Sequence, residues 1–176
     1  MNFILSLCYC SSRVSDVSNS NNPMILPMNS IEPHTDLSDV LWKTTVPFVP
    51  PVECGKVIKV YDGDTITIAT RLPFPNSPIY RFPVRLLGID SAEIKGKTKE
   101  EKSCAIASRD ALYSKIFGEI VTLKNVSTEK YGRILADVYL NDIHINQWML
   151  DNKLAVEYDG GTKHRPDEWE TITLPV

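Results

Sequence analysis

Three short segments carry the side chains that could do chemistry. An Asp-Gly-Asp-Thr run occupies residues 62–65, an Arg-Leu-Leu-Gly-Ile-Asp-Ser-Ala-Glu run occupies residues 85–93, and a Lys-Tyr-Gly-Arg run occupies residues 130–133. Hard divalent cations prefer carboxylate oxygens, and a guanidinium can donate two hydrogen bonds to one phosphate. The three segments together therefore contain the groups that metal-assisted hydrolysis of a phosphodiester bond requires.

The first two segments lie in a stretch with a β-strand pattern. Polarity alternates over residues 57–61 and again over residues 65–68, on either side of an Asp-Gly turn, which predicts a β-hairpin. A third strand is predicted over residues 80–87, with Gly88 at a β-bulge. The acidic groups of the 85–93 run should therefore leave the end of a strand together.

The later part of the domain alternates helices and strands. Apolar residues at helical spacing predict a helix over residues 103–116, two strands are expected at 119–126 and 134–140, and a second helix is expected at 146–152. Five strands with one helix between the third and fourth is the order of an oligonucleotide/oligosaccharide-binding (OB-fold) barrel. The fold class is thus α+β, mostly β, although the strand pattern alone would also permit an open sheet.

The N-terminal part of the chain has a different composition. Residues 11–51 are rich in Ser, Asn and Pro and show no sustained strand or helix period. Such a segment buries too little apolar surface to offset the entropy lost on ordering. We therefore expect a flexible tail over residues 1–51 and one folded domain over residues 52–176.

The three segments, in this order along the chain, resemble the staphylococcal nuclease (thermonuclease) family. The resemblance extends from about Gly55 to Tyr158. It implies a five-stranded OB-fold barrel with two or three short helices. It also implies a calcium-dependent endonuclease that hydrolyses DNA and also RNA, single-stranded or locally open, and leaves 3'-phosphate ends.

The resemblance implies that Ca2+ is held by Asp64, by Asp90 and by the backbone carbonyl of Ser91. Waters and a substrate phosphate would complete the six to eight oxygens that this ion takes. A serine in place of the family's threonine at position 91 should not matter, because the ligand is a carbonyl. Considered without the resemblance, Asp64 could instead cap the turn formed by Asp62 and Gly63.

Three residues correspond to the catalytic positions of the family. Glu93 matches the proposed general base, and Arg85 and Arg133 match the two arginines that bind phosphate. A planar guanidinium stabilises the dianionic transition state more than the monoanionic diester, so the contribution is catalytic. The alternatives left open by the residues alone are a surface role for Glu93, a buried salt bridge for Arg85 and a surface turn for Arg133.

Lys130 and Tyr131 match family positions that contact a terminal phosphate, and Tyr158 matches a base-stacking tyrosine. A solvated turn is the alternative for the first two residues. Trp148 lies on the apolar face of the second helix, so we expect it to pack in the core.

The sequence departs from the family pattern in three places. Ala92 replaces a common proline, which we expect to loosen the backbone that aims Glu93. The connection before Arg85 is longer and richer in proline, and the family's long C-terminal helix has no counterpart after Pro166.

Charge and cysteine content limit the other possibilities. The net charge is −3 and the pI is about 5.6, which argues against a broad basic surface and requires a local grip on nucleic acid. The four cysteines, Cys8, Cys10, Cys54 and Cys104, show no metal-binding spacing, so we expect a reducing, cytoplasmic location. No stretch is long enough to span a membrane, although S-acylation of Cys8 and Cys10 could provide a weak anchor.

We expect a monomer, and two other functions compete with the nuclease. One is a noncatalytic nucleic-acid-binding barrel, whose expected sign is the loss of a carboxylate or an arginine. The catalytic and metal-binding residues named above are all present, which disfavours it. The other is an adaptor in which the tail docks on membranes or proteins and the barrel is only a scaffold.

Overall fold

The computed structural model describes residues 37–96 and 98–161. The chain divides into two units, Met1–Thr45 and Val46–Val176. The described part of the first unit contains a single turn of 3-10 helix, η1 (Trp42–Thr44). The second unit contains all the other helices and strands of the described chain.

Several predictions fall on residues that the structure does not describe. They are the flexibility of the first part of the tail, the S-acylation of Cys8 and Cys10, and the missing helix after Pro166. The boundary at residue 51 stays a prediction. In the described part of the chain, no helix has the length and apolar character needed to cross a membrane.

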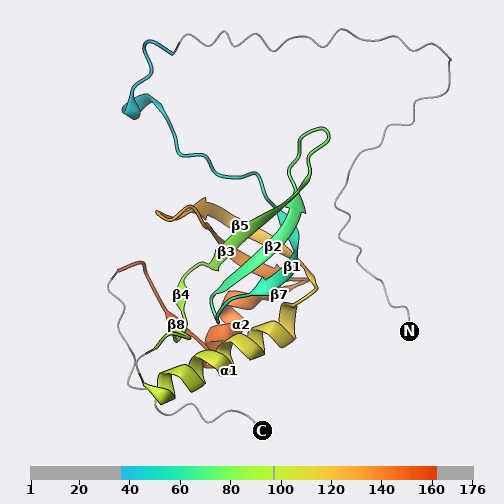
Figure 1. Cartoon of the computed structure of the whole chain (residues 1–176), viewed down its shortest axis with the longest axis vertical. Coiled ribbons are helices and arrows are strands. Elements are labelled where there is room, and N and C mark those ends of the chain that lie inside the picture. The colour runs from blue at the N-terminus through green and yellow to red at the C-terminus, as the bar shows by residue number, and fades with distance from the viewer. Residues whose placement is uncertain (1–36, 97, 162–176) are drawn as a thin grey trace, which may run out of the picture. The chain divides into compact units, whose positions relative to one another are not determined.

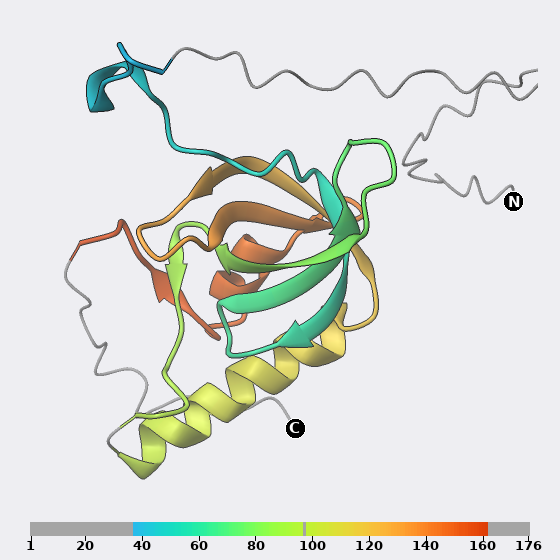
Figure 2. The same cartoon turned by 45° about the horizontal axis from the view of Figure 1, so that its top comes forward.

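Five strands close a barrel in the second unit (Figures 1 and 2). They are β1 (Cys54–Val60), β2 (Thr65–Arg71), β3 (Ile79–Leu86), β5 (Ile120–Thr128) and β6 (Ile134–Leu140). Antiparallel pairing joins β1 to β2 and β5, β2 to β3, and β5 to β6. A parallel pairing of β3 with β6 closes the barrel. The predicted five-stranded OB-fold barrel is therefore confirmed, and the open sheet is wrong.

The remaining elements are two helices and three short strands. They are β4 (Ile89–Asp90), α1 (Lys99–Ile116), β7 (Ile143–His144), α2 (Ile145–Asp151) and β8 (Val156–Glu157). Helix α1 lies between the third and fourth barrel strands in the chain and runs across one end of the barrel (Figure 2). Strands β4 and β8 pair with each other beside the barrel, so the chain segments after β3 and after α2 meet there.

Helix α1 begins one turn earlier than predicted. The side chain of Thr98 accepts a hydrogen bond from the backbone N–H of Glu101 at 3.1 Å and caps the helix. The inward-facing residues are Glu101, Ala105, Ser108, Leu112 and Ile116. Because two of these are polar, the apolar pattern alone missed the first turn. The Thr98 and Glu101 spacing is a capping-box signal that would have found it.

The bulge lies in β1 and not at Gly88. The pairing register between β1 and β2 shifts between Val57 and Lys59, so Val57 and Val60 both face the core while Ile58 faces outward. The strict alternation predicted for this strand is therefore wrong. Gly88 instead adopts a positive φ of 76° in the tight turn between β3 and β4, a conformation that glycine enters without steric cost.

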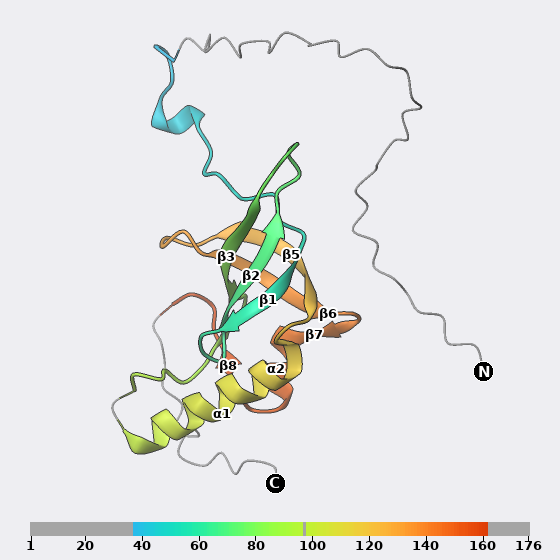
Figure 3. The same cartoon turned by 45° about the vertical axis from the view of Figure 1, so that its right-hand side comes forward.

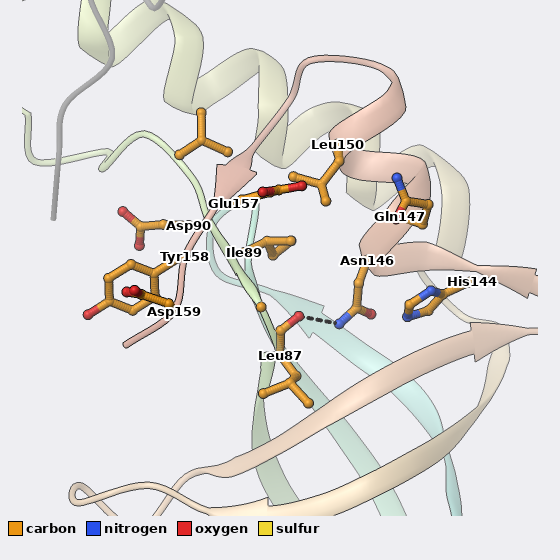
Figure 4. Close-up of a pocket in the computed structure, with 12 residues that line it drawn as sticks. Leu87, Ile89, Asp90, His144, Asn146, Gln147, Leu150, Glu157, Tyr158 and Asp159 are labelled. Atoms are coloured by element: carbon orange, nitrogen blue, oxygen red, sulfur yellow. Dashed lines mark hydrogen bonds between the residues drawn. The ribbon is translucent and has the colours of Figure 1, made fainter. Parts of the chain in front are cut away.

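Asn146 connects the barrel to the segment that carries the site. Its side-chain oxygen accepts a hydrogen bond from the N–H of Val138 at 2.9 Å, and its amide donates to the carbonyls of Leu87 (2.9 Å) and Ala136 (3.3 Å). Figure 4 shows the bond to Leu87 as a dashed line. Asn146 is buried, and both its side-chain oxygen and its amide nitrogen are hydrogen-bonded to the backbone. It therefore fixes the end of β3 against β6 and α2.

The long connection between β2 and β3 forms a hairpin that projects beyond the barrel (Figure 3). Its base is held by Ser77, whose hydroxyl accepts a hydrogen bond from the N–H of Leu72 at 3.0 Å and whose carbonyl accepts one from Arg71. The two strands stay in continuous register from Thr65 opposite Arg85 outward to this tip. The insertion predicted from the prolines therefore lengthens a hairpin and leaves the register at the site intact.

Candidate active site

Arg85 lies between two buried carboxylates. Its Nη1 is 2.7 Å from Oδ2 of Asp64, and its Nη2 is 2.7 Å from Oδ1 of Asp90. All three residues are buried. The buried salt bridge left open for Arg85 is therefore present, and it involves both of the carboxylates predicted to bind the metal.

The pairing of strands explains this meeting. Thr65 at the start of β2 lies opposite Arg85 in β3, and the N–H of Leu86 donates to the carbonyl of Asp64 at 2.8 Å. The turn at Gly88 then reverses the chain into β4. This reversal brings Asp90 back to Arg85, whose Nη2 also donates to the carbonyl of Ile89 at 3.3 Å.

Ser91 joins this group through its backbone. The N–H of Ser91 donates to Oδ2 of Asp64 at 3.2 Å, and the hydroxyl of Thr65 donates to Oδ1 at 2.8 Å. The turn-capping role considered for Asp64 belongs to Asp62, whose side chain accepts a hydrogen bond from the N–H of Asp64 at 3.3 Å. The structure thus brings Asp64, Asp90 and Ser91 together.

Gly63 allows the turn to lie this close to the helix. A Cβ atom at this position would be 1.9 Å from the hydroxyl oxygen of Ser108 in α1 and 2.8 Å from Cβ of Ser91. Ser108 cannot swing away freely, because its buried hydroxyl donates to the carbonyl of Leu154 at 2.6 Å. Gly63 is thus required for packing as well as for the turn.

Gly63→Ala is expected to destabilise the protein by about 1 to 3 kcal/mol, because the added methyl group overpacks a filled space. The turn must also move, which displaces Asp64 and should lower any cation affinity of the site. Urea denaturation measures the first effect. Ser108→Ala is the control, since it removes the Leu154 hydrogen bond without adding a clash; a denaturation midpoint for Gly63→Ala equal to that of wild type would contradict the packing argument.

Burial makes the site electrostatically strained. Desolvation, followed by repulsion from Asp62, raises the pKa of Asp64 to about 6 even though Arg85 opposes the shift. Burial alone would lower the pKa of Arg85, but Asp64 and Asp90 raise it above its ordinary value. One guanidinium therefore faces more negative charge than it can neutralise.

This donor set fits a divalent cation. Asp64 and Asp90 contact the two ends of one guanidinium, at Nη1 and Nη2 of Arg85, and burial followed by repulsion from Asp62 raises the pKa of Asp64, so added positive charge would favour its ionised form. Among the described residues, no three acidic, histidine or cysteine side chains cluster in a way that would hold a metal alone. Any ion bound here would need backbone, water or substrate oxygens in addition, which is usual for calcium.

A cavity of about 190 Å³ opens beside Asp64, whereas Asp90 does not line it. Its lining includes Asp64, Arg85, Ser91, Glu93 and Arg133.

Glu93 follows β4 in an exposed turn. The preceding Ala92 is buried against Ala105 of α1, so packing supports the backbone at the position where the family has proline. The expected loosening of the backbone at Ala92 stays a prediction.

Arg133 enters the cavity from the loop between β5 and β6. Its Nε donates to Oε1 of Glu129, and its Nη1 lies 3.5 Å from the hydroxyl of Thr65. The residue is only partly exposed and points toward the start of β2. The surface-turn alternative therefore does not describe its side chain.

A second cavity, of about 530 Å³, is also lined by Arg85. Lys130 and Tyr158 line it, and the Arg85 guanidinium lies 5.8 Å from the centre of the Tyr158 ring. Tyr131 does not line this cavity; its ring is 73% exposed and lies 5.0 Å from Nζ of Lys130. The structure thus brings two of the three predicted substrate-binding residues to the site and leaves Tyr131 at the rim of the turn.

A third cavity, of about 580 Å³, lies behind Asp90, between the paired strands β4 and β8 and helix α2 (Figure 4). Tyr158 and Asp90 lie at one end of it, and Asn146 and His144 at the other. Its wall is acidic because Asp90, Glu157 and Asp159 line it, which is unfavourable for a phosphate.

Trp148 is partly buried and packs against the core, as expected, and it lines none of these three cavities.

The model of the family described as staphylococcal nuclease homologue matches residues 83–172. The chain belongs to the staphylococcal nuclease family. This match includes Arg85, Asp90, Glu93 and Arg133 but not Asp64. The placement of Asp64 in the site of this family member therefore depends on the geometry described above.

Similar proteins include several that are named as nucleases. An uncharacterized endonuclease of Escherichia coli is 32% identical over 114 residues, which is 62% of this chain and 66% of that protein. A probable staphylococcal-like nuclease of Oryza sativa subsp. japonica is 32% identical over 92 residues, 51% of this chain and 22% of that protein. An uncharacterized protein of Bacillus anthracis is 29% identical over 162 residues, 88% of this chain and 72% of that protein. The family match and the two nuclease-named relatives support a nuclease of the hydrolase class.

Proposed function

We propose that the protein is a calcium-dependent endonuclease that hydrolyses phosphodiester bonds of DNA and also RNA and leaves 3'-phosphate ends. One observation carries this proposal. Arg85 bridges the buried carboxylates of Asp64 and Asp90 and lines one cavity together with Asp64, Ser91, Glu93 and Arg133. A carboxylate that could act as the general base, two guanidinium groups and two of the three proposed cation ligands, Asp64 and Ser91, thus line one small cavity.

Asp64, Asp90 and the carbonyl of Ser91 would hold the calcium ion. When bound, calcium would neutralise charge on the phosphate and favour deprotonation of water. Its charge would also offset the excess negative charge around Asp64, where burial and Asp62 raise the pKa. In this arrangement Arg85 need not remain bound to both carboxylates and can donate to a phosphate oxygen.

Glu93 accepts the proton of the attacking water, since it is a carboxylate on the exposed side of the cavity. Arg85 and Arg133 donate hydrogen bonds to the nonbridging oxygens and stabilise the charge that develops on them. Lys130 binds a neighbouring phosphate, Tyr158 stacks on a base, and Tyr131 contacts the substrate from the rim. The protein acts as a monomer on single-stranded or locally open nucleic acid.

The noncatalytic barrel is the second candidate, and the geometry does not favour it. Burying an ion pair costs desolvation free energy, and a barrel without catalysis would not need to retain such a pair. Arg85 and both carboxylates are nevertheless buried and paired. The test incubates purified protein with single-stranded DNA in calcium, in magnesium and in chelator. Cleavage that requires calcium, with ends that phosphatase treatment alters, supports the proposal; binding without cleavage in every condition would overturn it.

Calcium affinity is expected to fall in mildly acidic solution. Asp64 has a pKa of about 6 in the metal-free fold, so it is mostly protonated at pH 5 and must release that proton to bind a cation. The affinity should be about tenfold lower at pH 5 than at pH 7, because binding displaces one proton from Asp64 and each pH unit below 6 then lowers the affinity about tenfold. Calorimetric titration at the two pH values measures this, and an affinity independent of pH would exclude Asp64 as a ligand.

The same shift has a defined consequence for stability. Because the folded-state pKa of Asp64 is raised from 3.8, the metal-free folded protein binds this proton more tightly than the unfolded chain. Its contribution is therefore favourable below pH 4 and is lost as the pH rises through about 6. Calcium should stabilise the protein most above pH 6, where the carboxylate is ionised.

A further inference from the structure

Among the residues that the structure describes, Arg85 alone lines both the smaller cavity and the second cavity. The smaller cavity holds Glu93 and Arg133, and the second cavity holds Lys130 and Tyr158. A phosphate bound to Arg85 would therefore lie at the boundary between two recesses. The nucleic acid on its two sides would extend into different surroundings.

Tyr61 lines the smaller cavity and not the second cavity, which Tyr158 lines. It follows β1 directly, and its N–H donates to the carbonyl of Thr65 at 2.8 Å, so its backbone is held by the same hairpin turn that carries Asp64. The side chain is 51% exposed. A ring that is fixed at its base and open on its surface can act as a stacking platform.

Two lysines accompany this ring. Nζ of Lys59 lies 5.6 Å from the centre of the Tyr61 ring, and Lys95 lines the same cavity. Both side chains are exposed. Tyr61 with these lysines thus offers an aromatic surface and positive charge together, which is the combination that binds single-stranded nucleic acid. Tyr158 and Lys130 offer the same combination in the second cavity.

We propose that Tyr61 is a further substrate-binding residue, which stacks on the base adjacent to the scissile phosphate on the side opposite the base held by Tyr158, with Lys59 and Lys95 near the neighbouring phosphate. This inference rests on the proposed nuclease function. It makes the site two-sided: one strand crosses Arg85 and is held at both flanks. Such a site favours cleavage within a strand over removal of a terminal nucleotide.

The test measures kcat/KM for Tyr61→Leu and Tyr61→Phe on short single-stranded DNA with one cleavable linkage, the others being methylphosphonates. Loss of one stacked base should lower kcat/KM of Tyr61→Leu by roughly 5- to 150-fold, while Tyr61→Phe keeps wild-type activity. Tyr80→Leu is the matched control, since Tyr80 has a similar exposure of 44% but lies on β3 outside these cavities.

Two further substrates carry an abasic residue on one side or the other of the cleavable linkage. If Tyr61 stacks as proposed, Tyr61→Leu and wild type have the same kcat/KM on the substrate that lacks the base facing Tyr61. On the other abasic substrate, Tyr61→Leu keeps its full reduction in kcat/KM relative to wild type. An equal loss on both, or no loss on any substrate, would overturn the assignment. Anisotropy binding of the same oligonucleotides in chelator measures the contact without cleavage. A wild-type protein that binds but does not cleave would thus refute the nuclease and still decide the role of Tyr61.

Discussion

Glu93→Gln is expected to reduce cleavage of single-stranded DNA by about 100- to 10,000-fold, the usual contribution of a general base. The substitution removes the proton acceptor and keeps the size of the side chain. Glu93 is exposed at the mouth of the cavity, so the change should leave the fold intact. The measurement is the initial rate at saturating calcium, together with the thermal midpoint, which should move by less than about 3 °C because surface substitutions typically change stability by no more than about 0.5 kcal/mol.

Glu100→Gln is the matched control, because Glu100 is also exposed and lies in the first turn of α1 outside the cavity. It should keep wild-type activity. The Glu93 variant should still bind calcium, since the proposed ligands are Asp64, Asp90 and Ser91. If Glu93→Gln retained wild-type kcat, the base would have to be another group. If it instead lost calcium binding with its activity, Glu93 would be acting as a ligand.

The elements near the site were predictable because local signals agree there. The Asp62-Gly63 turn lies between two alternating segments, so the hairpin that positions Asp64 followed from sequence periodicity. The site residues themselves came from the family resemblance. Closure of the barrel was a different matter, because the parallel pairing of β3 with β6 joins segments that no local pattern connects. Only the family resemblance supplied it.

The incorrect predictions share a physical cause. The bulge in β1 and the turn at Gly88 depend on how strands meet other strands, and a single-strand pattern does not record this. Asn146 reads as an ordinary polar residue near a helix start, yet it satisfies three backbone groups. The sequence indicates only that Tyr61 belongs to the alternating segment of residues 57–61. Its position at the cavity follows from the turn behind it.

The charge arrangement could not be predicted from the sequence either. Nothing in the sequence alone says that Arg85 contacts both Asp64 and Asp90 or that Ser91 donates its N–H to Asp64, 27 residues away. Burial decides the electrostatic outcome, since it raises the pKa of Asp64 despite the salt bridge. The spacing of charged residues thus indicates the chemistry. The fold, through burial, determines the free energy required to hold these charges together.

Replacing Arg85 is expected to affect stability and activity together. Arg85→Gln leaves two buried carboxylates without their counter-charge, and removing one partner from a buried ion pair typically costs about 3 to 5 kcal/mol. Urea denaturation in chelator measures this cost. Arg81→Gln is the control, because Arg81 lies on the same strand but is exposed and pairs with Ala69 across the sheet. It should change the free energy of unfolding little.

Calcium should separate the two roles of Arg85. If the ion binds between the carboxylates, it supplies the missing positive charge and restores much of the lost stability of Arg85→Gln. Activity should not return with it, because loss of a preorganised phosphate donor still lowers the rate by about 100- to 1,000-fold. Arg85→Lys should be more stable than Arg85→Gln in chelator yet remain slow, since an ammonium group keeps the charge but cannot donate as a planar fork.

The double variant Asp64→Asn, Arg85→Gln tests the origin of the instability. Removing a carboxylate as well as the guanidinium should make it more stable in chelator than Arg85→Gln alone, because less unpaired charge is buried. It should also lose calcium binding. If the double variant were as unstable as the sum of its two single variants, the energy of this site would lie in packing, and the charge argument for a cation between Asp64 and Asp90 would fail.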